Sequence, residues 1–441
     1  YIRNGQFTAQ AGANWDHDVV TAQATYDSAD KRKLTNVANI SAIPVGALVE
    51  GAGVGREVYV KSKNTGAGEL TLSQPLYDAE GTQNFTFTAF KYMLDFSGFS
   101  SLKKFGISGV EFQCNGEASA LRLAPAGTVF AAHNCFFTKP KARGITSIGS
   151  GCQGMLVDNC QFLSDEDAAD VADRETIALN VNSNDVKLRH NRATRFRHWA
   201  VMAGSNHTVT GNHFFQGDSV AGGIRTAGIV VTDTYASHTI SENYIDNCFI
   251  EWTNEYDADP DFTGGFSFAA MSITDNVFLS GDVASWFSYI VVKPFGSGHF
   301  LNGVSVTGNK FRSINGNIDR AERVDTSFAN LNFTRSKDVF FDGNSFHNVS
   351  TQSRNPLRVE FDQNTVASTW TVPTGGTLPF QAYSRAVDAV IVEGALRNSG
   401  GSVAYPGHYV RTQEGSNNNE IDIIWEQAVR GTVRVLIRID R

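Results

Sequence analysis

The stretches VTGNHFF (209–215), ITDNVF (273–278) and VTGNKF (306–311) are variants of one phrase. Each has an apolar residue, then a polar one, then a small or charged one, and then Asn. An aromatic residue follows soon after. Aligned on that Asn, the phrase has nine copies, centred on Asn134, Asn159, Asn191, Asn212, Asn243, Asn276, Asn309, Asn344 and Asn364. The residue three places before each Asn is apolar, and the residue five places before is mostly apolar. This spacing of two predicts a strand with one buried face.

The interval between copies, roughly 20 to 35 residues, predicts a stacked solenoid whose coils bury their apolar rows against one another. Asn has two reasons to recur at one place. It tolerates the left-handed backbone of a sharp corner, and its amide can bond to the same amide one coil away. An earlier copy, from Ile107 to Phe112, has Val110 at the Asn position.

A second strand is expected in most coils. The candidates are 120–124, 144–148, 177–181, 199–203, 228–232, 249–253, 289–293 and LRVEF at 357–361. Crossover helices are not indicated, because amphipathic helical periodicity is weak throughout.

These repeats, from about Ile107 to Val366, resemble the right-handed parallel β-helix superfamily of pectate-lyase-like proteins, polygalacturonase-related glycosidases and phage tailspike depolymerases. The resemblance implies an all-β, right-handed parallel β-helix solenoid, a polysaccharide partner, a homotrimer, and a location outside the cell, on a cell surface or on a virion tail. It does not choose among lyases, hydrolases and non-catalytic adhesins, which share this fold. No residue string matches the catalytic motif of one family, so no catalytic role is transferred.

The flanks suggest appendages. We predict an opening coil at 1–33, a small inserted β module at 34–92, the β-helix at 93–370, and a C-terminal β cap or oligomerisation region at 371–441. The module is indicated by alternating strands separated by glycine-rich turns. The cap is expected because an uncovered last coil would expose a strand edge.

Bulk composition excludes several classes of protein. A net charge of -8 without a long basic run argues against a nucleic-acid partner. No apolar stretch is long enough to span a membrane. The cysteines, an odd five with no CxxC, are expected to be reduced core thiols, with Cys135 and Cys160 one above the other.

Candidate catalytic residues lie between 228 and 294. Parallel strands are about 4.8 Å apart, so carboxylates one or two coils apart match the separations that glycosidases use. Asp233, Glu251 and Glu255 are the predicted acids. Glu251 faces outward if Ile250 and Trp252 face inward. A hydrolase would use two of these acids.

Candidate substrate-binding residues are His198, Trp199, Arg225, Tyr256 and Lys293, with aromatics to stack on sugars and cations to hold acidic ones. A lyase would take His198, Tyr256 or Lys293 as base and Arg225 to neutralise a uronate. No cofactor is expected, and no metal ligand set is assigned.

Other interpretations stay open. Glu251 and Lys293 could form a plain ion pair between coils, and the acidic run 255–261 could be a solvated loop or bind calcium. A non-catalytic glycan-binding spike would have the same groove with its acids held in salt bridges.

Overall fold

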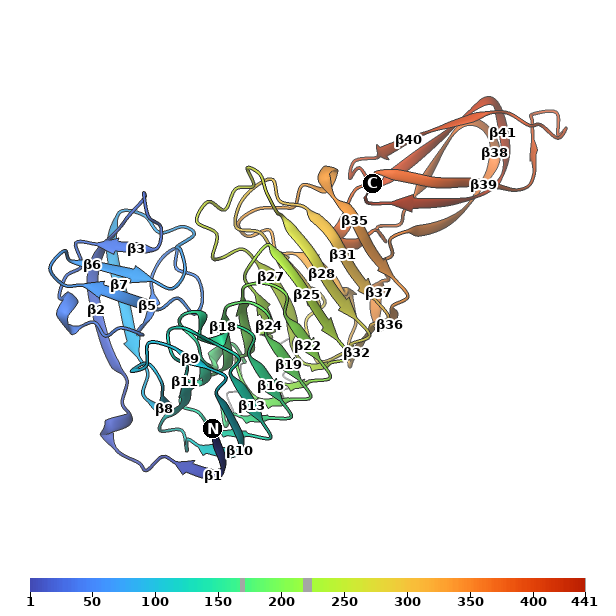
Figure 1. Ribbon diagram of the computed structural model, residues 1–441. Helices are drawn as coiled ribbons and strands as arrows, with labels where there is room; N and C mark the ends of the chain where they lie inside the picture. The colour runs from blue at the N-terminus through green and yellow to red at the C-terminus, as the bar shows by residue number, and fades with distance from the viewer. Residues whose placement is uncertain (167–170, 217–223, 441) are drawn as a thin grey trace.

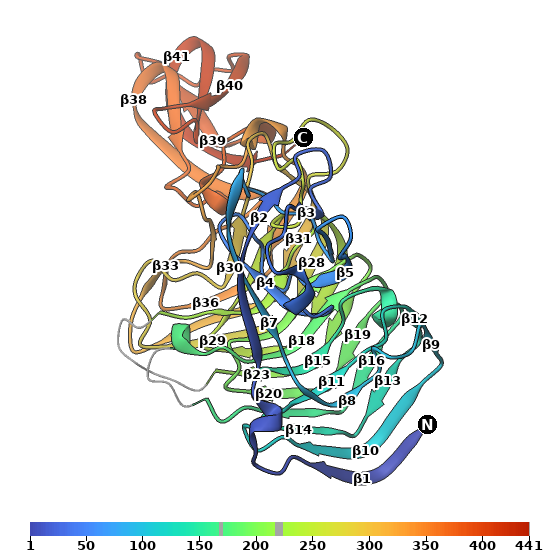
Figure 2. The ribbon, with the colours of Figure 1, turned by 90° about the vertical axis from the view of Figure 1, so that its left-hand side faces the viewer.

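The computed structural model describes residues 1–166, 171–216 and 224–440. In this part of the chain, two parallel sheets run side by side along a solenoid, one of 18 strands and one of nine (Figure 1). Figure 2 shows β1 at one end of the stack and the C-terminal strands beyond the other end. The fold predicted from the repeat, an all-β parallel β-helix, is confirmed.

The 18-stranded sheet takes two short strands from most coils. Its strands are β1 (Ile2–Thr8), β10 (Gly106–Gln113), β13 (Ala131–His133), β14 (Phe136–Thr138), β16 (Leu156–Asp158), β17 (Gln161–Leu163), β19 (Lys187–Arg189), β20 (Arg192–Thr194), β22 (Thr208–Thr210), β23 (His213–Phe215), β25 (Tyr235–Ser241), β26 (Tyr244–Asp246), β28 (Phe268–Thr274), β29 (Val277–Gly281), β31 (Leu301–Thr307), β32 (Lys310–Ile314), β35 (Lys337–Asp342) and β36 (Ser345–His347).

The nine-stranded sheet carries the second strand of each coil. Its strands are β8 (Tyr92–Asp95), β11 (Ser119–Arg122), β15 (Arg143–Thr146), β18 (Ile177–Asn182), β21 (His198–Ala203), β24 (Ala227–Val231), β27 (Phe249–Thr253), β30 (Ile290–Lys293) and β34 (Glu322–Val324). Two smaller pairs join β9 (Leu102–Lys103) to β12 (Gly127–Thr128) and β33 (Ile318–Arg320) to β37 (Val349–Thr351). No helix in the described residues is long and apolar enough to cross a membrane.

The recurring asparagines form a buried ladder along the solenoid axis. From Asn191 through Asn212, Asn243, Asn276 and Asn309 to Asn344, each side-chain Nδ2 donates to the Oδ1 of the next at 2.9–3.0 Å. The backbone N–H of each donor residue bonds to the same oxygen. The prediction that these amides stack is confirmed for six copies in this ladder, and Asn159 Nδ2 also donates to Asn134 Oδ1, one coil away, at 2.7 Å.

The first two copies are displaced by one position. Asn134 and Asn159 are themselves the left-handed corner residues, with φ of 52° and 53°. Cys135 and Cys160 fill the ladder positions, and the Cys160 N–H donates to Asn191 Oδ1 at 2.9 Å. In later coils the left-handed residue precedes the ladder Asn, as Gly211 does. Two adjacent positions therefore have separate roles. The first adopts the left-handed corner conformation, and the second bonds to the next coil. Asn occurs at either position.

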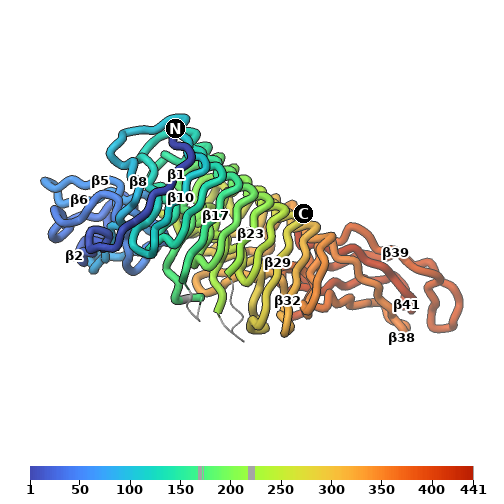
Figure 3. Tube along the Cα trace, turned by 90° about the horizontal axis from the view of Figure 1, so that it is seen from below, coloured from blue at the N-terminus to red at the C-terminus, as the bar shows by residue number. Residues whose placement is uncertain are grey.

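The prediction that Asn364 marks a ninth coil was wrong. Asn364 and the LRVEF segment both lie in β38 (Leu357–Pro373), an antiparallel strand paired with β41 (Glu420–Arg438). With β39 (Ala386–Arg397) and β40 (His408–Glu414) they form a C-terminal sheet beyond the last coil (Figure 3). Apolar alternation alone does not distinguish a parallel coil strand from a long antiparallel one.

The core is apolar and partly aromatic. Phe112, Phe137 and Phe162 stack on successive coils with ring centroids 5.2 and 4.5 Å apart. The five cysteines are free and buried, as predicted. Register therefore places equivalent side chains directly above one another along the axis.

A six-stranded antiparallel module packs on the outer face of the nine-stranded sheet (Figure 1). Its strands are β2 (Asp18–Tyr26), β3 (Lys33–Thr35), β4 (Leu48–Glu50), β5 (Val60–Asn64), β6 (Glu69–Leu72) and β7 (Thr82–Ala89). Strand β2 lies within the segment that the sequence suggested as the opening coil; β1 before it pairs with β10. Ala203 and Tyr256 of the β-helix belong to the module's apolar cluster, so the module is packed against the solenoid.

Candidate functional site

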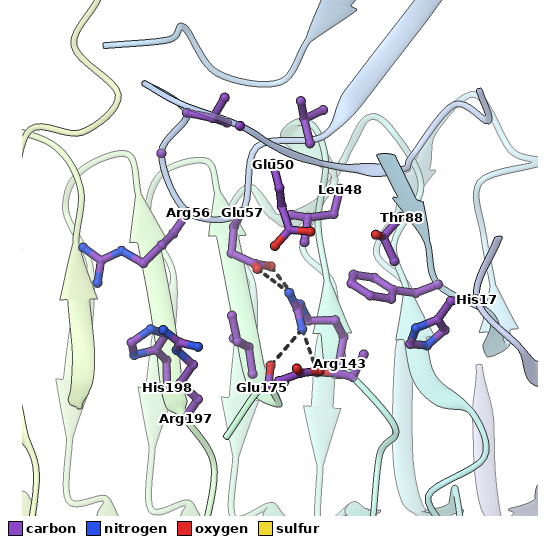
Figure 4. A pocket seen from close by; sticks show the side chains of 17 residues that line it. His17, Leu48, Glu50, Arg56, Glu57, Thr88, Arg143, Glu175, Arg197 and His198 are labelled. Atoms are coloured by element: carbon purple, nitrogen blue, oxygen red, sulfur yellow. Dashed lines mark hydrogen bonds and ion pairs between the residues drawn. The ribbon is translucent and has the colours of Figure 1, made fainter. Parts of the chain in front are cut away.

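A cleft of about 450 Å³ separates the module from the outer face of the nine-stranded sheet (Figure 4). The end of β4, the loop after it and the end of β7 form the module wall. The starts of β15, β18 and β21 form the β-helix wall. The charged and ionisable residues that line it are His17, Glu50, Arg56, Glu57, Arg143, Glu175, Arg197 and His198.

The floor of the cleft is fixed by a buried ion pair between the two walls. Arg143 Nη2 donates to Glu57 Oε1 at 2.7 Å, and Nε donates to Oε2 at 3.1 Å. The Arg143 guanidinium also lies 4.5 Å from the centre of the Phe90 ring. Its remaining donors bond the carbonyls of Ala142 and Glu175. These bonds join the module to the β-helix at the floor of the cleft.

A second ion-pair cluster lies beside the first and joins Arg56 to two of the predicted acids, Glu251 and Glu255. This cluster is called the clasp below. Arg56 Nε donates to both Glu255 oxygens, at 3.0 and 3.1 Å, and Arg56 Nη2 pairs with Glu251. Both acids are buried. Burial raises the pKa of Glu255, and the Arg56 charge opposes that rise. The Tyr256 hydroxyl donates to the Arg56 carbonyl.

Glu251 therefore does not pair with Lys293. Lys293 is in register with Thr253, two residues after Glu251, and its Nζ lies 5.4 Å from the Phe295 ring and 5.3 Å from the Phe328 ring. Instead of the expected ion pair between coils, Glu251 pairs with Arg56 of the inserted module. Sequence spacing does not reveal that the module lies against this strand.

The third predicted acid stands apart from that clasp. Asp233 follows β24 and accepts the backbone N–H of Gly204. Burial, then the neighbouring Asp257 carboxylate, raises the pKa of Asp233 to about 6. The three acids thus differ in environment: two are held by an arginine and one is half-buried at a strand end.

Of the five residues expected to bind substrate, His198 lines the cleft. Its Nδ1 lies 2.7 Å from the Ala227 carbonyl. Burial, followed by the charge of Arg56, lowers its pKa to about 3, so the ring is neutral at physiological pH. A neutral imidazole can donate or accept a hydrogen bond.

The other expected binding residues lie elsewhere. Trp199 is 2% exposed and packs on Phe214 with centroids 4.0 Å apart, so its ring faces the core and cannot stack on an external sugar. Tyr256 is buried beneath the module. Arg225 is buried and donates to the Gly281 carbonyl at 3.1 Å. The expected exposure of these side chains is not found, because Trp199 packs into the core and the module covers Tyr256.

Sequence reasoning missed Glu50 and Glu175; Arg197, which directly precedes the predicted His198, also lines the cleft. Among residues 1–166, 171–216 and 224–440, no side chain pairs with either carboxylate or forms an ion pair with the Arg197 guanidinium. Glu50 comes from the module and Glu175 from the β-helix (Figure 4). These residues become neighbours only because the module docks, and no local pattern in the sequence encodes that docking.

The cleft can hold a ligand with many hydroxyl groups. Its volume falls within the range of about 300–1,000 Å³ usual for ligand pockets. It offers carboxylate acceptors, a guanidinium donor, a neutral imidazole and the partly buried Phe90 ring. In the described residues no group of three or more His, Cys, Asp or Glu side chains is arranged to hold a metal ion. The acids of the run 255–261 have protein partners, such as Lys31 for Asp259 at 2.7 Å.

No family model and no curated protein matches the chain. Among solved structures, a double mutant of the tailspike protein of E. coli bacteriophage HK620 aligns with a TM-score of 0.33 and 11% identity, covering 79% of this chain and 71% of that one. The tailspike protein of Pseudomonas phage phi297 gives 0.33 and 12%, covering 98% and 84%. That of Pseudomonas phage LKA1 gives 0.30 and 9%, covering 96% and 81%.

These similarities are distant and carry no argument about activity. The fold is established by the chain's own strand pairing, coil after coil, in two parallel sheets. The chain is a right-handed parallel β-helix protein with an antiparallel module docked on one of its sheets.

Proposed function

We propose that the chain binds a surface polysaccharide in the cleft between the module and the nine-stranded sheet, and that Glu251 and Glu255 hold the module rather than act on the polymer. The observation that carries this proposal is that some charged residues near the cleft are paired with one another, whereas others are not. Arg56 engages the two acids, whereas Glu50, Glu175 and Arg197 face the cleft without an ion-pair partner among the described residues.

The β-helix wall suits a repeating ligand. Arg143, Ile177 and His198 are in register on three adjacent strands, β15, β18 and β21. Adjacent rungs are about 4.8 Å apart, so these residues extend along about 10 Å of the axis. On this wall Ile177 offers an apolar contact and His198 a hydrogen-bonding ring, whereas Arg143 is already held by Glu57. A polysaccharide partner would place the chain outside the cell, on a cell surface or a virion tail.

The test is binding to a panel of purified capsular and lipopolysaccharide-derived polysaccharides by biolayer interferometry. Arg197→Gln removes the unpaired cation and should weaken binding roughly 10- to 100-fold, since a hydrogen bond to a charged group contributes about 1.5–3 kcal/mol. Arg192→Gln is the matched control, because Arg192 is exposed on the other sheet. Equal binding by both variants and the wild type would exclude the cleft.

Hydrolysis is the second candidate function, and one observation favours it. Glu50 and Glu175 line the same cleft from opposite walls, and glycoside hydrolysis needs two carboxylates flanking the bond. A hydrolase would release reducing ends without unsaturated sugars, and Glu175→Gln would abolish that release. A lyase would instead give products that absorb through a new double bond. Binding without either product would mean that the chain recognises the polysaccharide but does not cleave it.

The predicted homotrimer stays a proposal. Sedimentation equilibrium of the purified chain distinguishes three copies from one.

A further inference from the structure

A second cavity, of about 600 Å³, lies at the other end of the solenoid. It opens between β34, the last strand of the nine-stranded sheet, and the C-terminal sheet. Strand β34 and strand β8 are the two edges of the nine-stranded sheet, so this cavity and the cleft under the module are lined by different strands of that sheet. The loop 415–419 between β40 and β41 and the turn Pro379–Gln381 form its far wall.

The floor of this cavity is a buried polar network centred on one oxygen of Glu322, whose Oε2 has no hydrogen-bond partner among the described residues. Glu322 is fully buried, and its Oε1 accepts from Arg320 Nε at 3.1 Å, Ser353 Oγ at 2.7 Å and the Phe380 backbone N–H at 3.1 Å. Arg320 also donates to the carbonyls of Gly376 and Leu378. The pair is therefore internally neutralised, and it fixes the position of both walls.

The rest of the lining is rich in side-chain amides. Gln381, Asn417, Asn418 and Asn419 line the cavity, and within the described residues their amides make no hydrogen bond. An amide offers two donors and an acceptor, so these four groups can bond hydroxyls in either direction. Tyr383, half-buried in the same wall, contributes a ring and a phenolic hydroxyl.

The cavity lining carries one positive charge that forms no ion pair among the described residues, although the Arg323 charge is near enough to contribute to lowering the pKa of Asp325 outside the lining. Its ionisable lining residues are Arg320, Glu322, Arg323 and Tyr383, and the first two form an ion pair. Arg323 forms no ion pair in the part of the chain that the structure describes, and its buried Nε makes no hydrogen bond. The Arg323 guanidinium lies 5.7 Å from the centre of the Trp286 ring, which is 53% exposed and is not part of the cavity lining.

We infer that this cavity binds an acidic saccharide unit. The amides would take the hydroxyl groups, and Arg323 would take the carboxylate through its planar fork. The argument rests on the cavity's own residues and does not require the cleft under the module to bind glycan. A rigid chain with sites at both ends could engage one polymer twice, which raises its effective affinity.

Saturation-transfer NMR on the full chain tests this inference, with sodium D-galacturonate, sodium D-glucuronate and methyl α-D-galactopyranoside as probes. Saturation transfer is expected to at least one uronate and to be weaker to the neutral galactoside. It should weaken at high salt, because the guanidinium contact is electrostatic. Arg323→Gln and Asn419→Ala should each remove it. Asn317→Ala is the control, because Asn317 is exposed and lies outside the cavity.

Arg197→Gln separates this site from the cleft. The inference predicts that uronate transfer survives in Arg197→Gln and in Asn317→Ala. Transfer that persists in Arg323→Gln and Asn419→Ala, or that disappears in Arg197→Gln instead, would overturn it. So would the absence of transfer to both uronates up to about 20 mM, where even a weak monosaccharide site is occupied.

Discussion

Arg56→Met removes the cation that holds Glu251 and Glu255 and tests whether those acids are structural. The Glu255 side chain is 5% exposed and that of Glu251 is 11% exposed, so neither can recover its hydration in place. Removing one partner from a buried pair costs about 3–5 kcal/mol, because the remaining charge stays buried. We expect a loss of that size in the free energy that keeps the module docked.

The reverse change should cost less. Glu251→Gln with Glu255→Gln leaves Arg56 unpaired, but that side chain is 28% exposed and can reach water. The triple variant, which removes the cation and both charges, should therefore be more stable than Arg56→Met alone, by roughly 2 kcal/mol. The cost of Arg56→Met should also shrink at acid pH, because burial raises the pKa of Glu255 and protonation of that carboxylate removes its buried charge.

Native-state hydrogen exchange of the module amides measures these differences without requiring the whole chain to unfold in one step. Lys33→Met is the control, because Lys33 and Glu69 form an exposed pair at 3.8 Å worth at most about 1 kcal/mol. Unchanged module protection in Arg56→Met would refute the clasp. So would a Glu251→Gln variant that loses polysaccharide cleavage while the module stays fully protected, since that is the behaviour of a catalytic acid.

Three further predictions follow from the geometry. Asn243→Ala leaves the Asn212 N–H and the Val209 carbonyl without their ladder partners and should destabilise the solenoid by about 2–4 kcal/mol in chemical denaturation, whereas the exposed Asn84→Ala should cost less than about 0.5 kcal/mol. The pKa of Asp233 is about 6, above its ordinary 3.8, so the folded chain binds that proton more tightly than the unfolded chain. The stability that this group contributes is therefore full below about pH 4 and is lost as the pH rises through 6. Asp233→Asn should remove about 1–3 kcal/mol of that loss between pH 4 and 7.5, and an unchanged pH profile of stability would contradict the prediction. Treatment with EDTA should leave the melting temperature unchanged within about 1 °C, because the acids of the run 255–261 already have protein partners, and a larger drop would establish a bound cation.

The fold could be predicted because its cause is repeated along the chain. Each coil needs a corner, a stacking amide and an inward aromatic, so local errors such as the displaced copies at Asn134 and Asn159 did not alter the overall inference. Asn364 shows the limit of this reasoning. Once the repeat ends, an Asn within an apolar strand has no coil to define its role.

The candidate site could be predicted only in part, because its walls come from different regions of the chain. Glu57 and Arg143 are separated by 86 residues, and Arg56 and Glu251 by 195. Strand alternation correctly suggested that Glu251 leaves the core, but not that a module would cover it. Arg56 was overlooked because it sits in a glycine-rich loop, where its role depends on what that loop docks against.

The most direct test of the account is a crystal structure of the chain with an oligosaccharide prepared from a polysaccharide that it binds. The account predicts sugar in the cleft, in contact with Arg197 and with Glu50 or Glu175, while Arg56 still holds Glu251 and Glu255. Sugar bound directly to Glu251 or Glu255, with the module displaced and the cleft unoccupied, would contradict it.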